Sequence, residues 1–197
     1  MKLLLSLPLT IILFYCSQAP NNNETQTDCE WCGANEAPDN TTSNTVIAGK
    51  NEAGERIKLT GTVYKSDGIT PAENVVLYLY HTNAKGIYPR RGNEKVNGKR
   101  HGYLRGWIKT EANGKYSFET IKPAAYPGRT EPAHIHITVK EPNKPEYWLK
   151  SYLFEDDDLL TDKDRKSDAK GDRFYHVIDL RSKDDLMIGS RDIRLRN

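Results

Sequence analysis

The sequence predicts an all-β protein with the architecture of an antiparallel β-sandwich. Short stretches that alternate apolar and polar residues recur along residues 55–197, and each is bounded by Gly, Pro, Asn or Asp. Helical periodicity is almost absent from the same region. The region has the length of one ordinary domain, so a single sandwich with irregular loops accounts for it.

The expected strands follow one another at short intervals. The first, residues 56–65, alternates cleanly and ends at the turn signal D-G-I-T-P-A. The others are expected at residues 74–82, 107–110, 115–120, 134–140, 147–155, 175–180 and 192–195. A solvated loop or a short helix is expected for the mixed-charge run E-D-D-D-L-L-T-D-K-D-R-K-S-D-A-K, which lacks the spacing of an EF-hand.

The N-terminus predicts export. Residues 1–16 contain one lysine followed by an apolar run of about twelve residues, which is short for a membrane span and typical of a secretory signal. Cys16 at its end resembles the lipid-attachment cysteine of bacterial lipoproteins, so we expect a lipoprotein anchored at the cell envelope. If Cys16 is instead a chance cysteine in an ordinary signal, the protein is periplasmic or secreted.

Residues 17–54 are expected to form a polar tether. This stretch is rich in Asn, Thr, Glu, Ala and Pro and shows no sustained period. It contains the motif C-E-W-C, with Cys29 and Cys32 at its ends. A local disulfide is favoured over half of a zinc site or a redox pair, because the second half of a zinc site is missing and an exported compartment is oxidising.

The charge balance argues against a nucleic-acid partner. The formal net charge is +2, and loss of Lys2 with the signal lowers it by one. Such a weak field favours neither nucleic acid nor acidic polymers. We expect contact with a membrane only through the lipid anchor, and a monomer or a small homodimer.

Residues 121–139 carry the candidate metal site. Side chains of a strand point alternately to its two faces, so His134 and His136 share one face while Ile135 and Ile137 share the other. The Cα atoms of the two histidines lie roughly 6.6 Å apart, which lets both imidazoles bind one ion. Tyr126 is the nearest further donor. A phenol, whose ordinary pKa is about 10, becomes a ligand beside a strong Lewis acid such as a ferric ion.

Longer motifs around these residues resemble the intradiol ring-cleavage dioxygenases, the catechol and protocatechuate family. The resemblance covers residues 59–160 and rests on Y-P-G-R-T-E-P-A-H-I-H, on G-K-Y-S-F-E-T-I-K-P before it and on N-A-K-G-I-Y further upstream. It implies a non-haem ferric ion (Fe3+) held by Tyr88, Tyr126, His134 and His136. It also implies that O2 cleaves a catecholic ring between the two hydroxyl-bearing carbons, giving muconate-type diacids, and that Tyr126 takes a proton from the substrate.

The chain departs from the family pattern at two positions. Glu131 stands where classical members carry an arginine, and Ser151 aligns with their glutamine. An inward carboxylate would repel an anionic ring carbon. We therefore expect Glu131 to point to solvent and Arg129 or Arg105 to supply the positive charge near the substrate. These two arginines and Tyr126 are the expected catalytic residues.

Other histidines and aromatic residues receive simpler interpretations. His101 lies in K-R-H-G-Y-L-R-G-W and is the extra histidine closest in sequence to the family's R-G turn. His81 and His176 are assigned no role. Packing is expected for the aromatic residues Tyr103, Trp107 and Tyr116.

Alternative functions stay open at this point. The motifs G-T-V and T-x-x-N-G-x-Y-x-F also occur in prealbumin-like modules that bind surfaces or carbohydrate without catalysis, and a β-sandwich supports either role. A zinc hydrolase would gain little from two phenolate ligands. The departures at Glu131 and Ser151 leave room for a relative that binds iron and catechols but turns over slowly.

Overall fold

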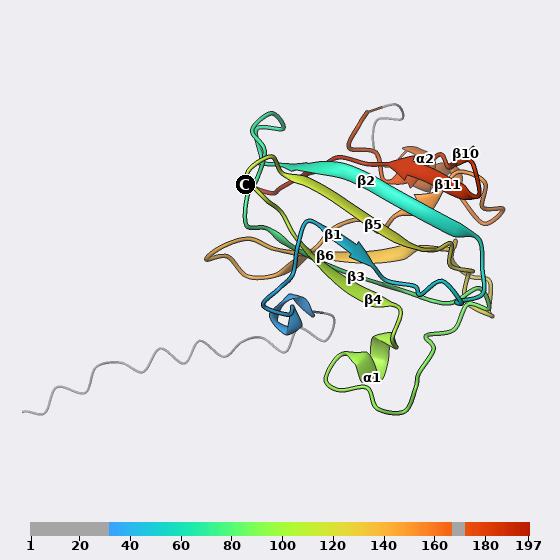
Figure 1. Ribbon diagram of the computed structural model, residues 1–197. Helices are drawn as coiled ribbons and strands as arrows, with labels where there is room; N and C mark the ends of the chain where they lie inside the picture. Colours follow the sequence, from blue (N-terminus) through green and yellow to red (C-terminus); the bar gives the residue numbers. More distant parts are fainter. Residues whose placement is uncertain (1–31, 167–171) are drawn as a thin grey trace, which may run out of the picture.

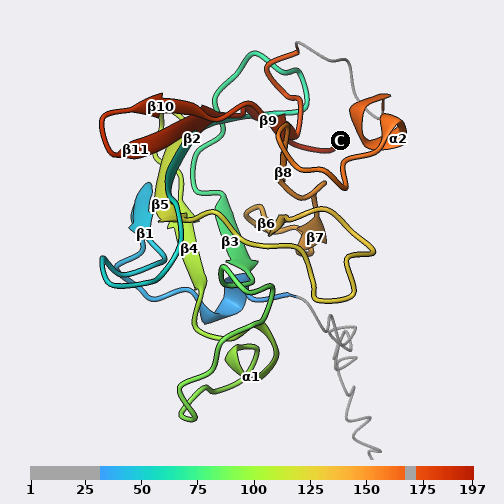
Figure 2. The ribbon, with the colours of Figure 1, turned by 90° about the vertical axis from the view of Figure 1, so that its right-hand side faces the viewer.

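The computed structural model describes residues 32–166 and 172–197, and two β-sheets pack face to face in it (Figure 1). The larger sheet has the strand order β1-β5-β2-β11-β10, with β12 also paired to β2, and the smaller sheet has the order β4-β3-β6-β7. Figure 2 shows the two layers from the side. The predicted all-β sandwich is confirmed. The expected signal segment, Cys16 and Cys29 lie outside the described residues.

The elements are short. The larger sheet consists of β1 (Asn44–Val46), β2 (Arg56–Tyr64), β5 (Lys115–Ile121), β10 (Arg181–Lys183), β11 (Leu186–Ser190) and β12 (Ile193–Arg194). The smaller sheet consists of β3 (Val76–His81), β4 (Arg105–Lys109), β6 (Ile135–Lys140) and β7 (Tyr147–Trp148), and a separate pair is formed by β8 (Leu153–Phe154) and β9 (Val177–Ile178). Helical segments are η1 (Ala34–Glu36), α1 (Gly98–His101) and α2 (Asp162–Lys166). Within the described ranges no helix combines the length and the apolar character that crossing a membrane requires.

Alternation along the strands fills the space between the two sheets. In β2, Ile57, Leu59 and Val63 are fully buried, while most of the residues between them are half-buried. The main core also contains, from other strands, Leu77, Leu79, Ile108, Phe118, Ile121, Ile135, Ile137 and Val139. Full burial of one such side chain stabilises the fold by about 1.5–3 kcal/mol. The core therefore holds β3 and β6, the strands next to the candidate site, in fixed positions.

Three features of the sheets differ from the prediction. The pairs β1–β5 and β11–β2 are parallel, because β1 and β11 do not reach their partners through tight hairpins. The expected strand 147–155 is split, since its pairing with β6 slips by one residue between Trp148 and Tyr152. The hairpin β10–β11 was not predicted, because β10 is exposed throughout and has no apolar alternation. The charged run contributes α2, one of its two expected forms.

The described part of residues 17–54 is not a tether, which corrects that prediction. Helix η1 contacts β3 and β6, and β1 adds a strand to the edge of the larger sheet beside β5 (Figure 1). Ala48 is fully buried in the main core. Cys32 takes part in a disulfide whose other half lies outside the described residues. The prediction failed because backbone pairing and small apolar residues hold this segment, and neither produces periodicity.

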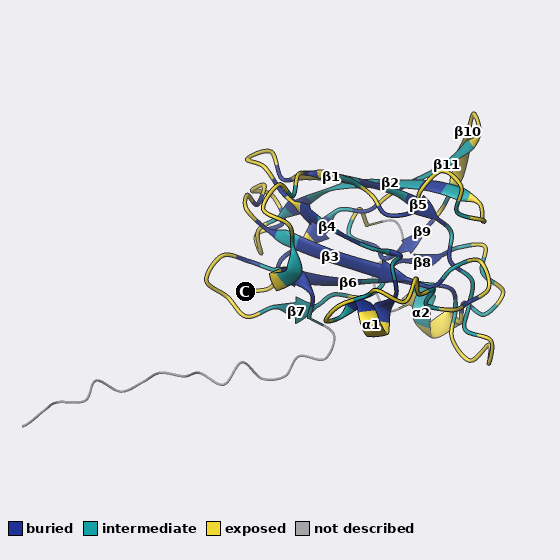
Figure 3. Cartoon of the chain, turned by 60° about the horizontal axis from the view of Figure 1, so that its bottom comes forward, coloured by how far each residue is buried: buried dark blue, intermediate teal, exposed yellow. Residues whose placement is uncertain are grey.

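A second cluster covers the outer face of the smaller sheet, and we call it the outer aromatic cluster. Tyr78 and Tyr80 alternate with Leu77 and Leu79 along β3, so they point away from the main core and are nevertheless almost fully buried. The cluster consists of Ala34, Tyr78 and Tyr80, with Val76, Tyr88, Trp107 and Trp148 packed against it. Figure 3 shows β3 and β6 as largely buried strands with α1 nearby. This covered face holds the candidate site.

Candidate metal centre

Strand β6 positions the two histidines. Ile135 and Ile137 are fully buried in the main core, so His134 and His136 point to the opposite face, as alternation predicts. His134 directly precedes β6, and its Nδ1 donates a hydrogen bond of 2.7 Å to the carbonyl of Pro132. Because this bond places the proton on Nδ1, the lone pair of His134 Nε2 is available to a metal ion.

Two loops bring the tyrosines to the same place. Tyr88 lies in the loop after β3, and Tyr126 lies in the loop after β5. The loops meet at Gly86, which has a φ of 73° and where a Cβ would come within 2.0 Å of a carbonyl oxygen of the second loop. Only glycine fits there. The carbonyl of Asn83 accepts hydrogen bonds from the amides of Gly86 (3.0 Å) and Ala124 (3.1 Å), which ties the loops together.

The four predicted ligands come together in space. Tyr88 Oη and Tyr126 Oη are 2.7 Å apart. Tyr126 Oη lies 3.3 Å from His134 Nε2 and 3.2 Å from His136 Nε2. The two imidazole Nε2 atoms are 3.0 Å apart. All four side chains are half-buried, so the donor atoms face a shared point that solvent and small molecules can approach.

This donor set fits a ferric ion better than zinc. Two ligands bound at about 2.1 Å and at right angles are about 3.0 Å apart, close to the separations found here. Across residues 32–166 and 172–197, no group of three or more His, Cys, Asp or Glu side chains could hold a metal ion, so the two phenols are needed to complete the set. Zinc sites use His, Cys and carboxylate ligands, whereas tyrosinate is an established ligand of iron.

Burial favours the uncharged forms of Tyr88, Tyr126 and His136 in the absence of a cation. Burial, together with the hydrogen bond to Tyr126, raises the pKa of Tyr88 well above its usual range, and burial also raises the pKa of Tyr126. Burial and the neighbouring His134 lower the pKa of His136 to about 3. At neutral pH the centre presents phenols and a neutral His136, and a strong Lewis acid would convert the phenols into phenolate ligands.

Comparison with known proteins identifies the family. The family model described as Dioxygenase matches residues 31–195 of the chain. Relatives matched by the sequence include protocatechuate and catechol dioxygenases. The chain belongs to the intradiol ring-cleavage dioxygenase family. The family match begins at residue 31, so it includes residues 31–54 of the segment that was expected to be a tether.

This dioxygenase-family chain matches only a part of each curated relative. The protocatechuate 3,4-dioxygenase beta chain of Burkholderia cepacia is 35% identical over 92 residues, which cover 44% of this chain and 39% of the relative. Catechol 1,2-dioxygenase 1 of Acinetobacter lwoffii is 34% identical over 99 residues, which cover 40% of this chain and 30% of the relative. The chain thus matches 39% and 30% of the length of these two curated relatives.

Solved structures of family members share the fold. The dioxygenase domain of a dioxygenase carbohydrate-binding protein fusion from Streptomyces sp. SirexAA-E superposes with a TM-score of 0.59 at 22% identity, covering 80% of this chain and 90% of that one. An intradiol ring-cleavage dioxygenase from Tetranychus urticae gives a TM-score of 0.55 at 21% identity, covering 78% and 85%.

Two backbone anchors of the histidine strand were missed by the sequence analysis. The Oδ2 atom of Asp157 accepts a hydrogen bond of 2.9 Å from the amide of Ala133, next to His134. Tyr152 and Ile135 exchange two backbone hydrogen bonds of 3.0 and 2.9 Å. Ser151, in the position of the family's glutamine, is half-buried and directly precedes Tyr152. No sequence signal marks Asp157, because its partner lies far away along the chain.

Glu131 and Arg129 lie at the solvent side of the Tyr126 loop. Both residues are exposed, as was predicted for Glu131. The negative charge of Glu131 adds to burial in raising the pKa values of Tyr88 and Tyr126, so it lies near enough to act on the centre. Arg129 has a φ of 49°, and its amide donates a hydrogen bond of 2.8 Å to the carbonyl of Tyr126. Its catalytic role stays a prediction.

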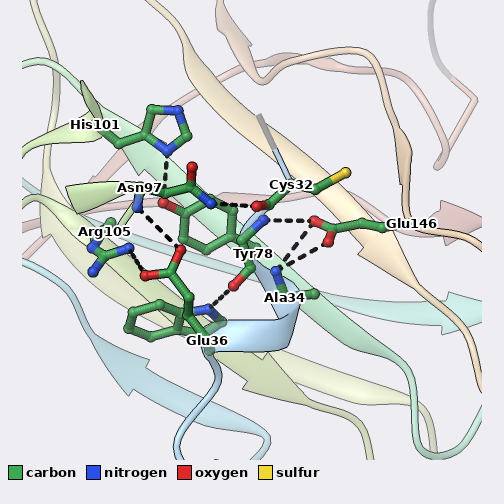
Figure 4. A network of polar contacts seen from close by, with 10 residues as sticks. Cys32, Ala34, Glu36, Tyr78, Asn97, His101, Arg105 and Glu146 are labelled. Atoms are coloured by element: carbon green, nitrogen blue, oxygen red, sulfur yellow. Dashed lines mark hydrogen bonds and ion pairs between the residues drawn. The ribbon is translucent and has the colours of Figure 1, made fainter. Parts of the chain in front are cut away.

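Arg105 belongs to a network around Glu36, and the catalytic role expected for it stays a prediction (Figure 4). Its Nη1 lies 2.8 Å from Oε2 of Glu36, and both side chains are largely buried. The guanidinium also lies over the ring of Trp107, 4.9 Å from its centroid. Because Glu36 neutralises this cation, Arg105 is a weak source of positive charge for a substrate. The sequence analysis missed the pair because it placed Glu36 in the tether.

The remaining histidines and aromatic residues have structural partners. His101 packs against the outer aromatic cluster, where its Nδ1 is 2.7 Å from Tyr78 Oη and its ring stacks on Tyr80. His81 lies on the inner face, with its Nε2 2.7 Å from Thr120 Oγ1. The three aromatic residues predicted to pack do so. Trp107 stacks on Tyr78, Tyr116 belongs to the main core, and Tyr103 packs against that core. His176 is buried, and its ring makes a T-shaped contact with the ring of Tyr175.

Proposed function

We propose that this chain is a non-haem ferric dioxygenase that cleaves catechol-type rings between the two hydroxyl-bearing carbons. The observation that carries the proposal is the meeting of two phenol oxygens and two imidazole nitrogens: Tyr126 Oη lies within 2.7–3.3 Å of the other three donor atoms, and the two Nε2 atoms are 3.0 Å apart. A module that only binds surfaces has no physical need for this arrangement. Family membership supports the same reaction type.

Tyr88, Tyr126, His134 and His136 would hold the ion. When bound, ferric iron supplies Lewis acidity and accepts electron density from a chelating aromatic diol. Catechol and O2 combine into one muconate-type diacid that contains both oxygen atoms, so no separate reductant is required. The protein's part is to hold the four donors in place.

Tyr126 is the residue best placed to receive a proton from the substrate. Its hydroxyl lies within 3.3 Å of three of the other donor atoms, and it is carried by a loop whose following residues are exposed. Its raised pKa, caused by burial, means that a Tyr126 released from a cation would hold the proton at Oη.

A slow dioxygenase is the second candidate. Glu131 keeps a negative charge near the tyrosines, and Ser151 has a shorter side chain than the family's glutamine. Both features predict weaker stabilisation of an anionic substrate, while all four donor side chains stay in place. The two candidates therefore differ in turnover rate and agree on iron and catechol binding.

The test is oxygen uptake by the iron-loaded protein with catechol. We expect one O2 consumed per catechol and a ring-opened diacid that carries both atoms of labelled O2. Tyr126→Phe should lower turnover strongly, and Tyr147→Phe, whose hydroxyl bonds Glu141, is the matched control that should not. Oxygen uptake without a doubly labelled diacid would contradict the proposed reaction.

Export with a lipid anchor at Cys16 is part of the proposal. The apolar N-terminal run and the cysteine at its end support it. Wild-type protein should incorporate a labelled fatty acid and sediment with membranes, while Cys16→Ser should do neither. Equal sedimentation of both proteins would overturn the anchor.

A further inference from the structure

Tyr80 differs from the other fully buried tyrosines in its hydroxyl group. Tyr116 Oη lies 2.8 Å from Tyr152 Oη and donates a bond of 2.6 Å to the carbonyl of Arg191, and Tyr78 Oη lies 2.7 Å from His101 Nδ1. The hydroxyl of Tyr80 is buried and has no hydrogen-bond partner among the described residues. It is a buried polar atom without a hydrogen-bond partner among the described residues, next to tyrosines whose hydroxyls have one.

The orphaned hydroxyl lies beside the metal centre. Tyr80 is the cross-strand partner of His136, and the two rings stack with centroids 4.5 Å apart. The ring of Tyr88 lies 5.9 Å away, and His101 covers the other side at 3.7 Å. Tyr126 adds to burial in raising the pKa of Tyr80 above its usual range, so the Tyr80 hydroxyl lies near enough to this donor to interact with it.

Keeping such a hydroxyl buried without a partner is unfavourable. The loss of its hydrogen bonds to water is not compensated within the protein, and phenylalanine would fill the same space without that cost. A partner that arrives with a ligand removes the penalty. An oxygen atom of a bound aromatic diol is such an acceptor, and it would come to the same face of the sheet.

We propose that Tyr80 is a substrate-binding residue whose hydroxyl donates a hydrogen bond to an oxygen of the aromatic diol bound at this centre. The inference rests on the proposed function and adds a protein donor to it. The side chain lies in the rigid β3 strand, with rings on both sides, so the donor is held in place before the substrate arrives.

The test compares Tyr80→Phe with Tyr116→Phe, a buried tyrosine with satisfied hydrogen bonds in the main core. In the metal-free proteins, Tyr80→Phe should keep or raise the melting temperature, because it removes an unpaired polar atom. Tyr116→Phe should lower it by about 2–6 °C, because it leaves partners unpaired. A clear drop for Tyr80→Phe would show that its hydroxyl already has a partner, such as a buried water, and would overturn the inference.

Ligand affinity is measured next, with catechol added to the iron-loaded proteins under nitrogen so that turnover cannot occur. With iron content equal to wild type, Tyr80→Phe should bind catechol about 10- to 100-fold more weakly, while Tyr116→Phe binds as wild type does. Equal affinity of wild type and Tyr80→Phe overturns the inference alone. Failure of the wild type itself to bind iron or catechol overturns the proposed function, and with it the inference.

Discussion

The two faces of the smaller sheet are built from the same strands and differ in what they bury. The inner face presents aliphatic side chains such as Leu79 and Ile137 to the main core. The outer face presents the tyrosines of β3 and the histidines of β6 to a thinner cover of loops and η1. One residue of register separates Ile137 from His136, so packing of the inner face fixes the position of the outer face.

This difference separates stability from chemistry. The inner face contributes hydrophobic free energy and needs no particular donor atoms, whereas the outer face holds buried polar groups at a cost in stability. Substitutions on the outer face should therefore lower iron binding and leave the fold, whereas substitutions on the inner face should lower stability and leave iron binding.

Loss of an outer-face histidine should remove the metal and leave the fold. His136→Ala is expected to weaken iron binding by more than about 100-fold, because it deletes a donor and not merely a group that supports one. The inner-face neighbour substitution Ile135→Val is the matched control and should retain iron. Metal analysis after dialysis measures both. If His136→Ala kept a full equivalent of iron, the assigned ligand set would be wrong.

Loss of an inner-face side chain should have the reverse effect. Leu79→Ala leaves a cavity in the main core and should lower the free energy of unfolding of the metal-free protein by about 2–5 kcal/mol. Its folded fraction should still bind iron. Urea denaturation measures the free energy of unfolding. A decrease of less than about 1 kcal/mol in Leu79→Ala would show that the inner face is less well packed than described.

The one titratable group on the inner face of β3 predicts a pH dependence. Burial lowers the pKa of His81 from 6.5 to about 4. Between these values the unfolded chain binds a proton that the folded protein does not, so stability falls as the pH falls from 6.5 to 4. The full effect is about 3 kcal/mol.

His81→Gln should reduce the slope of stability against pH within this window. Unfolding of the metal-free proteins is measured by urea denaturation at several pH values between 7 and 4. Parallel curves for wild type and His81→Gln would contradict the assigned role, since His101, whose pKa burial also lowers to about 4, would then account for the dependence.

The smallest effect is expected at the cover of the outer face. Glu36→Gln removes the charge that pairs with Arg105 in a largely buried site and should cost about 1–2 kcal/mol. The matched control is Glu119→Gln, which breaks a more exposed pair with Lys58 and should cost less than about 0.5 kcal/mol. Equal effects in thermal unfolding would indicate that η1 contributes little to the outer face.

The sequence predicted the features that depend on local pattern. Alternation in β6 was enough to place His134 and His136 on one face, and the motif resemblance selected Tyr88 and Tyr126, which the fold brings to the same point. Glu131 is exposed, as its charge near an anionic substrate required.

Features that depend on contacts between distant residues could not be predicted. Three such features arise only when the sheets form: the ion pair of Glu36 and Arg105, the hydrogen bond through which Asp157 anchors Ala133, and the burial of the Tyr80 hydroxyl. Strand β1 has three residues, too few for a period, and is fixed by its register with β5. Local sequence carries no information about such register.

The most direct test of the account is a visible absorption spectrum of the iron-loaded protein, with metal analysis of the same sample, before and after catechol is added under nitrogen. The account predicts about one iron per chain and a red-brown tyrosinate-to-iron band that shifts when catechol binds and that is missing from His136→Ala. A wild-type protein that stays colourless after ferric loading would contradict the central claim that the outer face of the smaller sheet is an iron centre.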